Sequence, residues 1–248
     1  IKEIKEIYMT LLGTAKIDTH CDKLGIFRKE LTEFTIPDGV TKIGDQAFAE
    51  CSSLTSINIP NGVTTIGYMA FRRCTSLKSI DIPDSVTEIG NRAFYGCTSL
   101  QSITIPDGVT EIGESTFEKC TSLTSITLPD TVTKIDEFAF DGCTSLEYII
   151  IPDNVTTIGF GAFGQCNSLT QIICNNPDLF TDENIDNRDQ IQFISTTEYF
   201  KEHYQELLAI EDSGFNSNHV SSKELNLIIK LHQEDFHPNW NSIVTTFN

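Results

Sequence analysis

Hydrophobic residues recur with a period of 23 residues along the middle of the chain. One position of this period is Phe in six successive copies, and each Phe is followed three residues later by Cys and six residues later by Leu. A fixed period of this length is typical of a solenoid, in which each period forms one turn of a coil. The pattern therefore predicts that residues of the same phase lie directly above one another. The phenylalanines of this column are Phe48, Phe71, Phe94, Phe117, Phe140 and Phe163.

The polar and apolar positions within one period predict two short strands. Ile80 and Ile82 alternate with polar residues, as expected for a strand with one covered face. Pro83 ends this strand because it has no backbone donor, and residues 86–89 then form a second short strand. The Ala-Phe-x-x-Cys segment that follows is too short for a stable helix, and we expect it to make one tight turn.

The outward positions of the first strands predict a broad sheet face on which a partner could bind. These positions are small and polar in most turns, but in the last two turns they form an apolar patch. Such a patch requires a cover, and two hypotheses remain open: the C-terminal segment folds back over it, or Tyr148 anchors a partner protein. The candidate partner-binding residues of this face are Tyr148, Ile150, Ile173, Glu147, Gln101, Lys78 and Asp81.

Two polar columns share the same period. Threonine recurs beside the second strand, where stacked side chains predict a ladder, and serine recurs just before the periodic Leu, where it is expected to bond turn backbone. We interpret both columns as structural. The threonines are Thr41, Thr64, Thr87, Thr110, Thr133 and Thr156, and the serines are Ser53, Ser76, Ser99, Ser122, Ser145 and Ser168.

Six of the eight cysteines, from Cys51 to Cys166, occupy one phase of the repeat. Metal ligation or a ladder of disulfides would be the functional interpretations. Zinc sites use short clusters of ligands, however, and parallel side chains in identical rotamers do not aim at each other. We therefore expect small buried side chains that fill the core, including Cys174 in a strand position. Cys21, beside His20, lies outside this pattern.

Helical spacing of apolar residues appears only at the two ends of the chain. Residues 1–12 predict an amphipathic helix that either caps the first turn or is the tail of a longer helical region. After Asn175-Asn176-Pro177 the repeat stops, and residues 178–189 are acidic and linker-like. Helices are predicted from Thr196 or Thr197 to Ile210, from Ser221 to about Glu234, and after Pro238. They close the far end of the solenoid or form a small module with its own activity.

The repeat resembles the BspA-like, Treponema-type leucine-rich repeat. The string C-x-x-L-x-x-I-x-I-P-x-x-V-T-x-I-G-x-x-A-F spans Cys74 to Phe94 and again Cys97 to Phe117, with Thr116 in place of Ala. The resemblance covers residues 31–174. It implies an α/β repeat that is mostly β, namely a right-handed leucine-rich-repeat solenoid of about six 23-residue turns with helical N- and C-terminal caps. It also implies a secreted, surface or host-interacting protein that binds protein or matrix partners, with no shared catalytic residues.

These patterns divide the chain into three parts, and charge narrows their partners. Residues 1–30 form an N-terminal capping region, residues 31–174 the solenoid, and residues 175–248 a helical C-terminal cap or module. Their net charges are +1, −10 and −9, and the whole chain carries −18. Such an acidic protein repels nucleic acid and anionic membrane surfaces, whereas a basic patch on a protein partner would be attracted.

No apolar run approaches the roughly 20 residues that span a bilayer, so membrane insertion is not predicted. The sequence begins Ile1-Lys2-Glu3 without Met and without a signal-peptide pattern, so we expect either a trimmed sequence or a mature fragment from which export signals have been lost. A secreted or cell-surface location is favoured by the resemblance, and delivery into a host cell is the alternative.

The chemical motifs in the chain have simpler structural explanations, so no cofactor or metal is predicted. Residues 159–164 match G-x-G-x-x-G, but these glycines belong to a repeat turn and no dinucleotide-binding unit surrounds them. His232 and His237 are five residues apart, which does not align them on one helix face. The acidic column of Asp84, Asp107, Asp130 and Asp153 suggests calcium, but Asp after Pro more simply starts a turn.

The leading hypothesis is a non-enzymatic protein-binding scaffold that uses the solenoid sheet face. The alternative is an effector-like protein whose C-terminal helical module carries an activity while the repeats serve for targeting. A third possibility is an architectural spacer in a larger surface protein.

Overall fold

The structure is a computed structural model that describes residues 29–196, 198 and 199. The helix predicted for residues 1–12, Cys21 and the two helices predicted after Ser221 lie outside the described residues. Only the start of the first C-terminal helix is described, where the backbone N–H of Glu198 donates to Ser195 Oγ at 3.2 Å.

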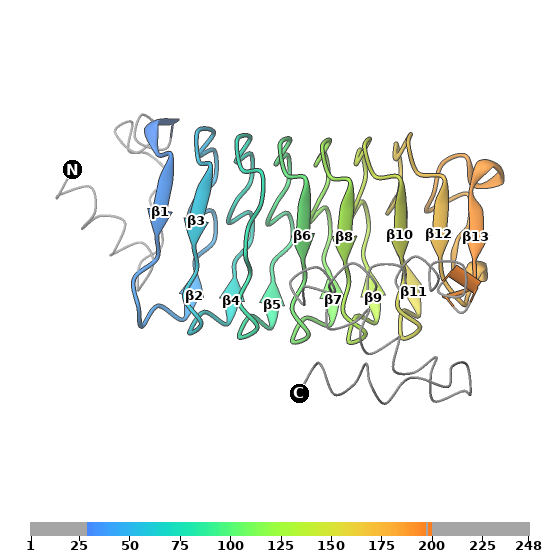
Figure 1. Ribbon diagram of the computed structural model, residues 1–248, viewed down its shortest axis with the longest axis horizontal. Helices are drawn as coiled ribbons and strands as arrows, with labels where there is room; N and C mark the ends of the chain where they lie inside the picture. Colours follow the sequence, from blue (N-terminus) through green and yellow to red (C-terminus); the bar gives the residue numbers. More distant parts are fainter. Residues whose placement is uncertain (1–28, 197, 200–248) are drawn as a thin grey trace, which may run out of the picture. The chain divides into compact units, whose positions relative to one another are not determined.

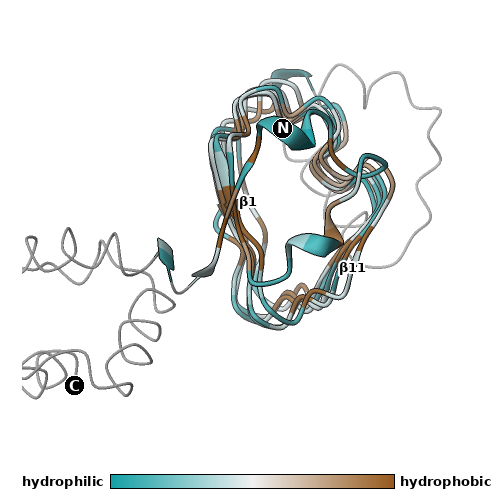
Figure 2. Ribbon diagram, turned by 90° about the vertical axis from the view of Figure 1, so that its right-hand side faces the viewer, coloured by the Kyte–Doolittle hydropathy of each residue, from teal (hydrophilic) through white to brown (hydrophobic). Residues whose placement is uncertain are grey.

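The described part is a mostly-β solenoid of about seven turns with a spacing of 23 residues (Figure 1). Every strand pairs with a strand of an adjacent turn. The paired strands run parallel and keep one register, as in Glu33 with Ser56 and Tyr148 with Gln171. Viewed down the stack, the turns lie over one another and repeat the same order of apolar and polar segments (Figure 2). The predicted mostly-β solenoid with a spacing of 23 residues is therefore confirmed, with about seven turns where about six were expected.

The first strand of each turn forms one side of the coil, here called the first-strand side. Its strands form three short parallel sheets, ordered β1-β3, β6-β8 and β10-β12-β13. In the third turn the strand predicted at Ile80 and Ile82 is not formed, although Ile80 is buried. The prediction of a strand there is wrong. A strand needs several backbone hydrogen bonds to a neighbouring strand, and in the described chain residues 78–82 make only one to a neighbouring turn, from Gln101 N–H to Lys78 O. The strands are β1 (Glu33–Thr35), β3 (Ser56–Asn58), β6 (Ser102–Thr104), β8 (Ser125–Thr127), β10 (Tyr148–Ile150), β12 (Gln171–Ile173) and β13 (Gln192–Ile194).

The second strands form the second-strand side, in two sheets ordered β2-β4-β5 and β11-β9-β7. The predicted threonine ladder runs along it: each Thr hydroxyl donates to the Thr carbonyl of the preceding turn, as from Thr64 to Thr41 at 3.2 Å. The ladder is interrupted between Thr87 and Thr110, where the two sheets separate. The strands are β2 (Lys42–Ile43), β4 (Thr65–Ile66), β5 (Glu88–Ile89), β7 (Glu111–Ile112), β9 (Lys134–Ile135) and β11 (Thr157–Ile158).

The predicted role of the serine column is not seen in the described residues, where no side-chain bond from these serines occurs. The threonine one residue earlier makes the bond to turn backbone instead, as in Thr75 to Ser52 O at 3.2 Å and Thr144 to Thr121 O at 3.3 Å. The threonine hydroxyl at this position lies close enough to the preceding turn to bond its backbone, so the ladder runs along the threonines and not along the serines.

The segment between the second strand and the periodic Cys forms the third side of the coil. Its backbone makes a continuous ladder to the next turn, as from Phe48 N–H to Ala70 O at 2.8 Å and from Glu50 N–H to Arg72 O at 2.7 Å. Two positions per turn have positive φ, for example Arg73 at 58°, so the chain makes two linked turns here. One of these turns lies within the Ala-Phe-x-x-Cys segment, as predicted, and the other precedes it.

The core contains the predicted columns. The six phenylalanine rings are buried, with neighbouring centroids 5.2–5.5 Å apart and planes within 13° of parallel. The periodic cysteines are buried, and the Cys74 thiol donates to Phe48 O of the preceding turn at 3.1 Å. Equivalent bonds recur up to Cys166. Core filling by cysteine, including Cys174, is confirmed.

The solenoid continues past the last sequence repeat. Phe180, Ile185 and Ile191 are buried in the same core, and Phe180 packs on Phe163 with centroids 5.7 Å apart. Residues 178–189 therefore form most of a closing turn, with two 3-10 helices, η1 (Pro177–Leu179) and η2 (Arg188–Gln190). The linker-like interpretation of these residues is wrong, because this acidic stretch contains two core residues, Phe180 and Ile185.

Candidate functional site: the outer surfaces of the solenoid

The outer face of the first-strand side is made of short polar residues over its N-terminal turns. The hydroxyls of Thr55 and Thr124 donate to backbone carbonyls of the preceding turn at 2.9 and 3.1 Å. These hydroxyls therefore fasten the turns together and present mainly methyl groups and backbone to solvent. The face offers a flat surface with few free hydrogen-bonding groups at these positions.

The predicted site residues fall into two groups on this face. Lys78, Asp81 and Gln101 are exposed in the third and fourth turns. Glu147 is exposed at the sixth turn, about 15 Å farther along at the usual spacing of stacked strands. The structure therefore does not bring the polar candidates together into one patch.

The apolar candidates do meet, on β10 and β12. Tyr148 is 39% exposed, and Ile150 lies beside Ile173 in the register of the two strands. Ile150 is half-buried and Ile173 is fully buried, although neither belongs to the interior core. The expectation that Ile173 is an exposed binding residue does not hold, so the accessible anchor of this face is Tyr148.

Sequence reasoning missed the exposed residues of the third side. Phe160 is 58% exposed, and its ring meets the half-buried Phe138 edge-on with centroids 5.5 Å apart. Phe160 has the same phase as Asp45, Tyr68 and Asn91 in earlier turns. The change from polar residues to Phe at this position could have identified it in the sequence. A large apolar side chain in a polar column is the feature that marks it.

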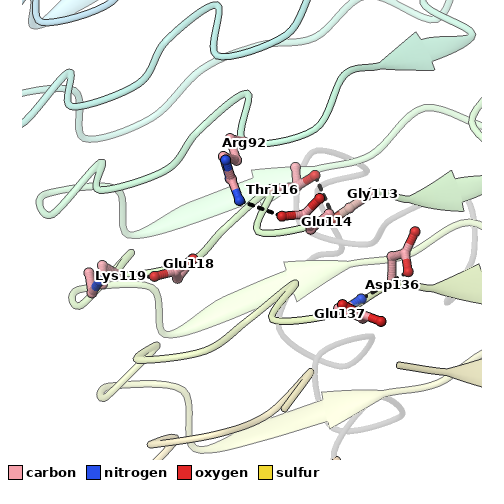
Figure 3. A network of polar contacts seen from close by, with 8 residues as sticks. All are labelled: Arg92, Gly113, Glu114, Thr116, Glu118, Lys119, Asp136 and Glu137. Atoms are coloured by element: carbon pink, nitrogen blue, oxygen red, sulfur yellow. Dashed lines mark hydrogen bonds and ion pairs between the residues drawn. The ribbon is translucent and has the colours of Figure 1, made fainter. Parts of the chain in front are cut away.

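The third side also carries most of the cations of the repeats, and three of them form ion pairs. Arg72 bonds Glu50 at 2.9 Å, and Arg92 contacts Glu114. A hydrogen bond that the Arg92 guanidinium donates to the Tyr68 hydroxyl and the charge of Glu114 raise the pKa of Arg92. Lys119 bonds Glu118 at 2.9 Å (Figure 3). These exposed ion pairs contribute little to stability, but they leave few cations available to an anionic ligand.

The carboxylates of the later turns on the third side have no such partners. In the described chain, Glu137, Asp141, Glu183 and Asp186 form no ion pair with Lys or Arg. Burial raises the pKa of Asp141, the charges of Glu118 and Asp186 raise it further, and the charge of Lys119 partly opposes this rise. This region therefore holds excess negative charge that a cation would relieve.

The buried thiols do not form a chemical site. Burial raises the pKa of Cys97 and Cys166 to about 12, so both are protonated and unreactive at neutral pH. Within the described residues, no group of three or more His, Cys, Asp or Glu side chains is arranged to hold a metal ion.

A groove opens where the second-strand sheets separate, between β5 and β7. It has a volume of about 550 Å³, and its lining includes Thr87, Gly90, Asn91, Thr110 and Gly113. The phenylalanine rings of these two turns remain stacked, with centroids 5.5 Å apart. Because stacked strands lie about 4.8 Å apart, the gap is too narrow to admit another strand.

The family assignment rests on the repeat. A family model for the BspA type leucine rich repeat region matches residues 26–120 and 87–209, with six copies. The chain belongs to the BspA-type leucine-rich repeat family. Leucine-rich repeat proteins are generally non-enzymatic scaffolds that bind other proteins.

Several solved leucine-rich repeat proteins are similar to this BspA-type chain over part of its length. A T. pallidum leucine rich repeat protein is 33% identical over 57% of this chain and 66% of its own, with a TM-score of 0.53. A Eubacterium ventriosum protein is 32% identical over 56% and 44%, with a TM-score of 0.44. A leucine rich cell surface protein of Faecalibacterium prausnitzii is 27% identical over 71% and 64%, with a TM-score of 0.38.

This chain spans less than two thirds of the length of each of these solved relatives. A search of curated proteins finds no match. Within the described residues, no helix has the length and apolar character needed to cross a bilayer.

Proposed function

We propose that this protein is a non-enzymatic scaffold that binds a partner protein on the outer face of the first-strand side. The observation that carries the proposal is the exposed ring of Tyr148 on a face whose other exposed residues are mainly polar. Aromatic residues of this kind are enriched at the centres of protein interfaces. The half-buried Ile150 on the same strand provides an apolar neighbour.

The partner class follows from the family and from charge. Resemblance to BspA-type proteins favours a secreted or cell-surface location and a host or matrix protein as the partner. The net charge of −18 favours a partner with a basic surface. Glu147, next to Tyr148 and exposed, is positioned to contact such a surface at the rim of the interface.

Binding of the full chain to a panel of purified extracellular-matrix proteins tests this proposal. Tyr148→Ala should weaken binding by about 30-fold or more, the size expected for loss of an interface hot spot. Tyr68→Ala is a matched control, since Tyr68 is 38% exposed but lies on the third side. It should bind as the wild type does.

Urea unfolding separates recognition from stability, because Tyr148→Ala should leave the unfolding midpoint unchanged. The proposal fails if the wild type binds no protein of the panel. It also fails if Tyr148→Ala and Tyr68→Ala bind equally well.

A further inference from the structure

An exposed aromatic pair on the third side is not explained by stacking of the repeats. The buried columns supply the stacking contacts, whereas the Phe160 ring contacts Phe138 on the outer surface. Gly161 makes this arrangement possible: a Cβ added there would lie 2.7 Å from Phe138, and its φ is +60°. The glycine thus leaves room for the Phe138 ring to lie over the next turn.

Carboxylates flank this pair along the stack. The Phe138 N–H donates to Phe160 O at 3.0 Å, and the Gly161 N–H donates to Glu183 O at 2.8 Å. Phe160 therefore lies one turn from Glu183, and it lies one turn from Glu137 on its other side. Both glutamates are exposed and form no ion pair among the described residues. Glu137, Phe160 and Glu183 therefore follow one another along the stack, with the aromatic ring between two carboxylates.

This arrangement matches the chemistry of an arginine side chain. A guanidinium group stacks on aromatic faces and donates to carboxylates in its own plane. The carboxylates of Asp141 and Asp186 add to the attractive field, and although the charges of Lys119 and Lys134 reach Asp141 and Glu137, neither lysine forms an ion pair with these two carboxylates among the described residues. An anionic or purely apolar ligand would meet unfavourable charge at the rim.

The terminal segments of the chain are poor occupants of this surface. Residues 200–248 contain three Lys and Arg residues against seven Asp and Glu residues, and residues 1–30 contain six against five. A second copy would also carry −18, which opposes self-association. Charge complementarity therefore favours a different molecule with a basic surface.

We propose that Phe138, Phe160, Glu137 and Glu183 form a docking surface for an arginine-rich segment of a partner protein. One arginine side chain stacks on the aromatic pair while its guanidinium donates to the flanking glutamates. This surface is separate from the Tyr148 face of the proposed function, and the two surfaces can be tested independently.

The test uses the full chain and a labelled oligo-arginine peptide, with binding followed by fluorescence anisotropy. Phe160→Ala should weaken binding by about 2- to 30-fold, the range of a cation–π contact from exposed to desolvated settings. Phe160→Leu keeps apolar volume and removes the aromatic face, so it should weaken binding to a similar extent. An oligo-lysine peptide should bind less tightly because its ammonium groups cannot stack as planar donors.

Matched variants separate this site from general charge attraction. Glu137→Gln and Glu88→Gln each remove one exposed carboxylate, but Glu88 lies on β5 of the second-strand side. Glu137→Gln should weaken binding more than Glu88→Gln does. Tyr148→Ala should have no effect, so failure of the proposed function leaves this outcome unchanged.

Two results would overturn the inference. The first is failure of the wild-type chain to bind oligo-arginine at low ionic strength. The second is equal weakening by Glu137→Gln and Glu88→Gln together with unchanged binding by Phe160→Ala, which would show diffuse attraction by net charge. Unchanged thermal unfolding of Phe160→Ala would show that any loss of binding is local.

Discussion

The inner and outer columns of the third side differ although they lie on the same short segments. The inner column holds Phe in six turns, with rings stacked at 5.2–5.5 Å. The adjacent outer column changes from Asp45 to Tyr68, then Asn91, and ends with Phe160 and Glu183. Stacking constrains the inner column because each ring is the neighbour of the next. The outer column does not bear that constraint, so its residues are available for recognition.

The largest expected contrast is between Phe117→Ala and Phe160→Ala in free energy of unfolding. Phe117 is fully buried, and its removal should cost about 3–5 kcal/mol because a cavity interrupts the ring stack. Phe160 is mostly exposed, so its removal should change stability by about 0.5 kcal/mol or less. Urea unfolding measures both. Equal losses would show that the outer pair supports the fold.

High pH should test the inner thiol column. Unfolded Cys97 ionises near its ordinary pKa of 9.0, whereas in the fold burial raises the pKa to about 12. Between these values the unfolded state binds fewer protons, so stability falls as pH rises. The wild type should lose about 1.4 kcal/mol per pH unit more than Cys97→Ala between pH 9 and 11.

Parallel slopes for the two proteins in denaturant unfolding at each pH would show that this thiol ionises in the folded state as it does when unfolded. Other groups that titrate in this range, such as Tyr and Lys, are present in both proteins and cancel in the difference.

The smallest expected effect on stability concerns the threonine ladder of the second-strand side, an outer column that keeps the same residue in six successive turns. Thr133 donates its hydroxyl to Thr110 O at 3.3 Å, whereas the Thr110 hydroxyl makes no bond in the described residues. Thr133→Val should therefore cost about 0.5–1 kcal/mol more than Thr110→Val. Thermal unfolding of the two variants measures the difference. A larger loss for Thr110→Val would contradict the interruption between β5 and β7.

The sequence predicts the features that depend only on a residue's position within the 23-residue period. The phenylalanine stack, the buried cysteines and most of the threonine ladder follow from one period, because stacked turns place equal phases together. The break in the ladder at Thr110 does not follow, since Thr110 is the same residue type as its neighbours in the column. Its cause is a separation between turns that the period does not encode.

The closing turn and the third side show two other limits. Phe180 follows Phe163 after 17 residues instead of 23, so its core role is hidden from a search for one fixed period. At the second positive-φ position of the third side, glycine occurs in two turns, at Gly96 and Gly142, whereas Arg73 and Lys119 take the same conformation in others, so the residue types signal this turn only in part. For the candidate sites, Tyr148 was found by its polar surroundings, whereas Phe160 was overlooked as part of a glycine-containing turn.

The buried cysteines, whose thiols bond phenylalanine carbonyls of the preceding turn, can serve as probes of local unfolding in each turn. A thiol reagent in solution can modify a buried cysteine only when the turn around it opens. Because successive turns each carry one such residue, labelling followed by mass spectrometry would report the opening of each turn separately. Fraying from either end of the coil could thus be distinguished from unfolding of the whole protein at once.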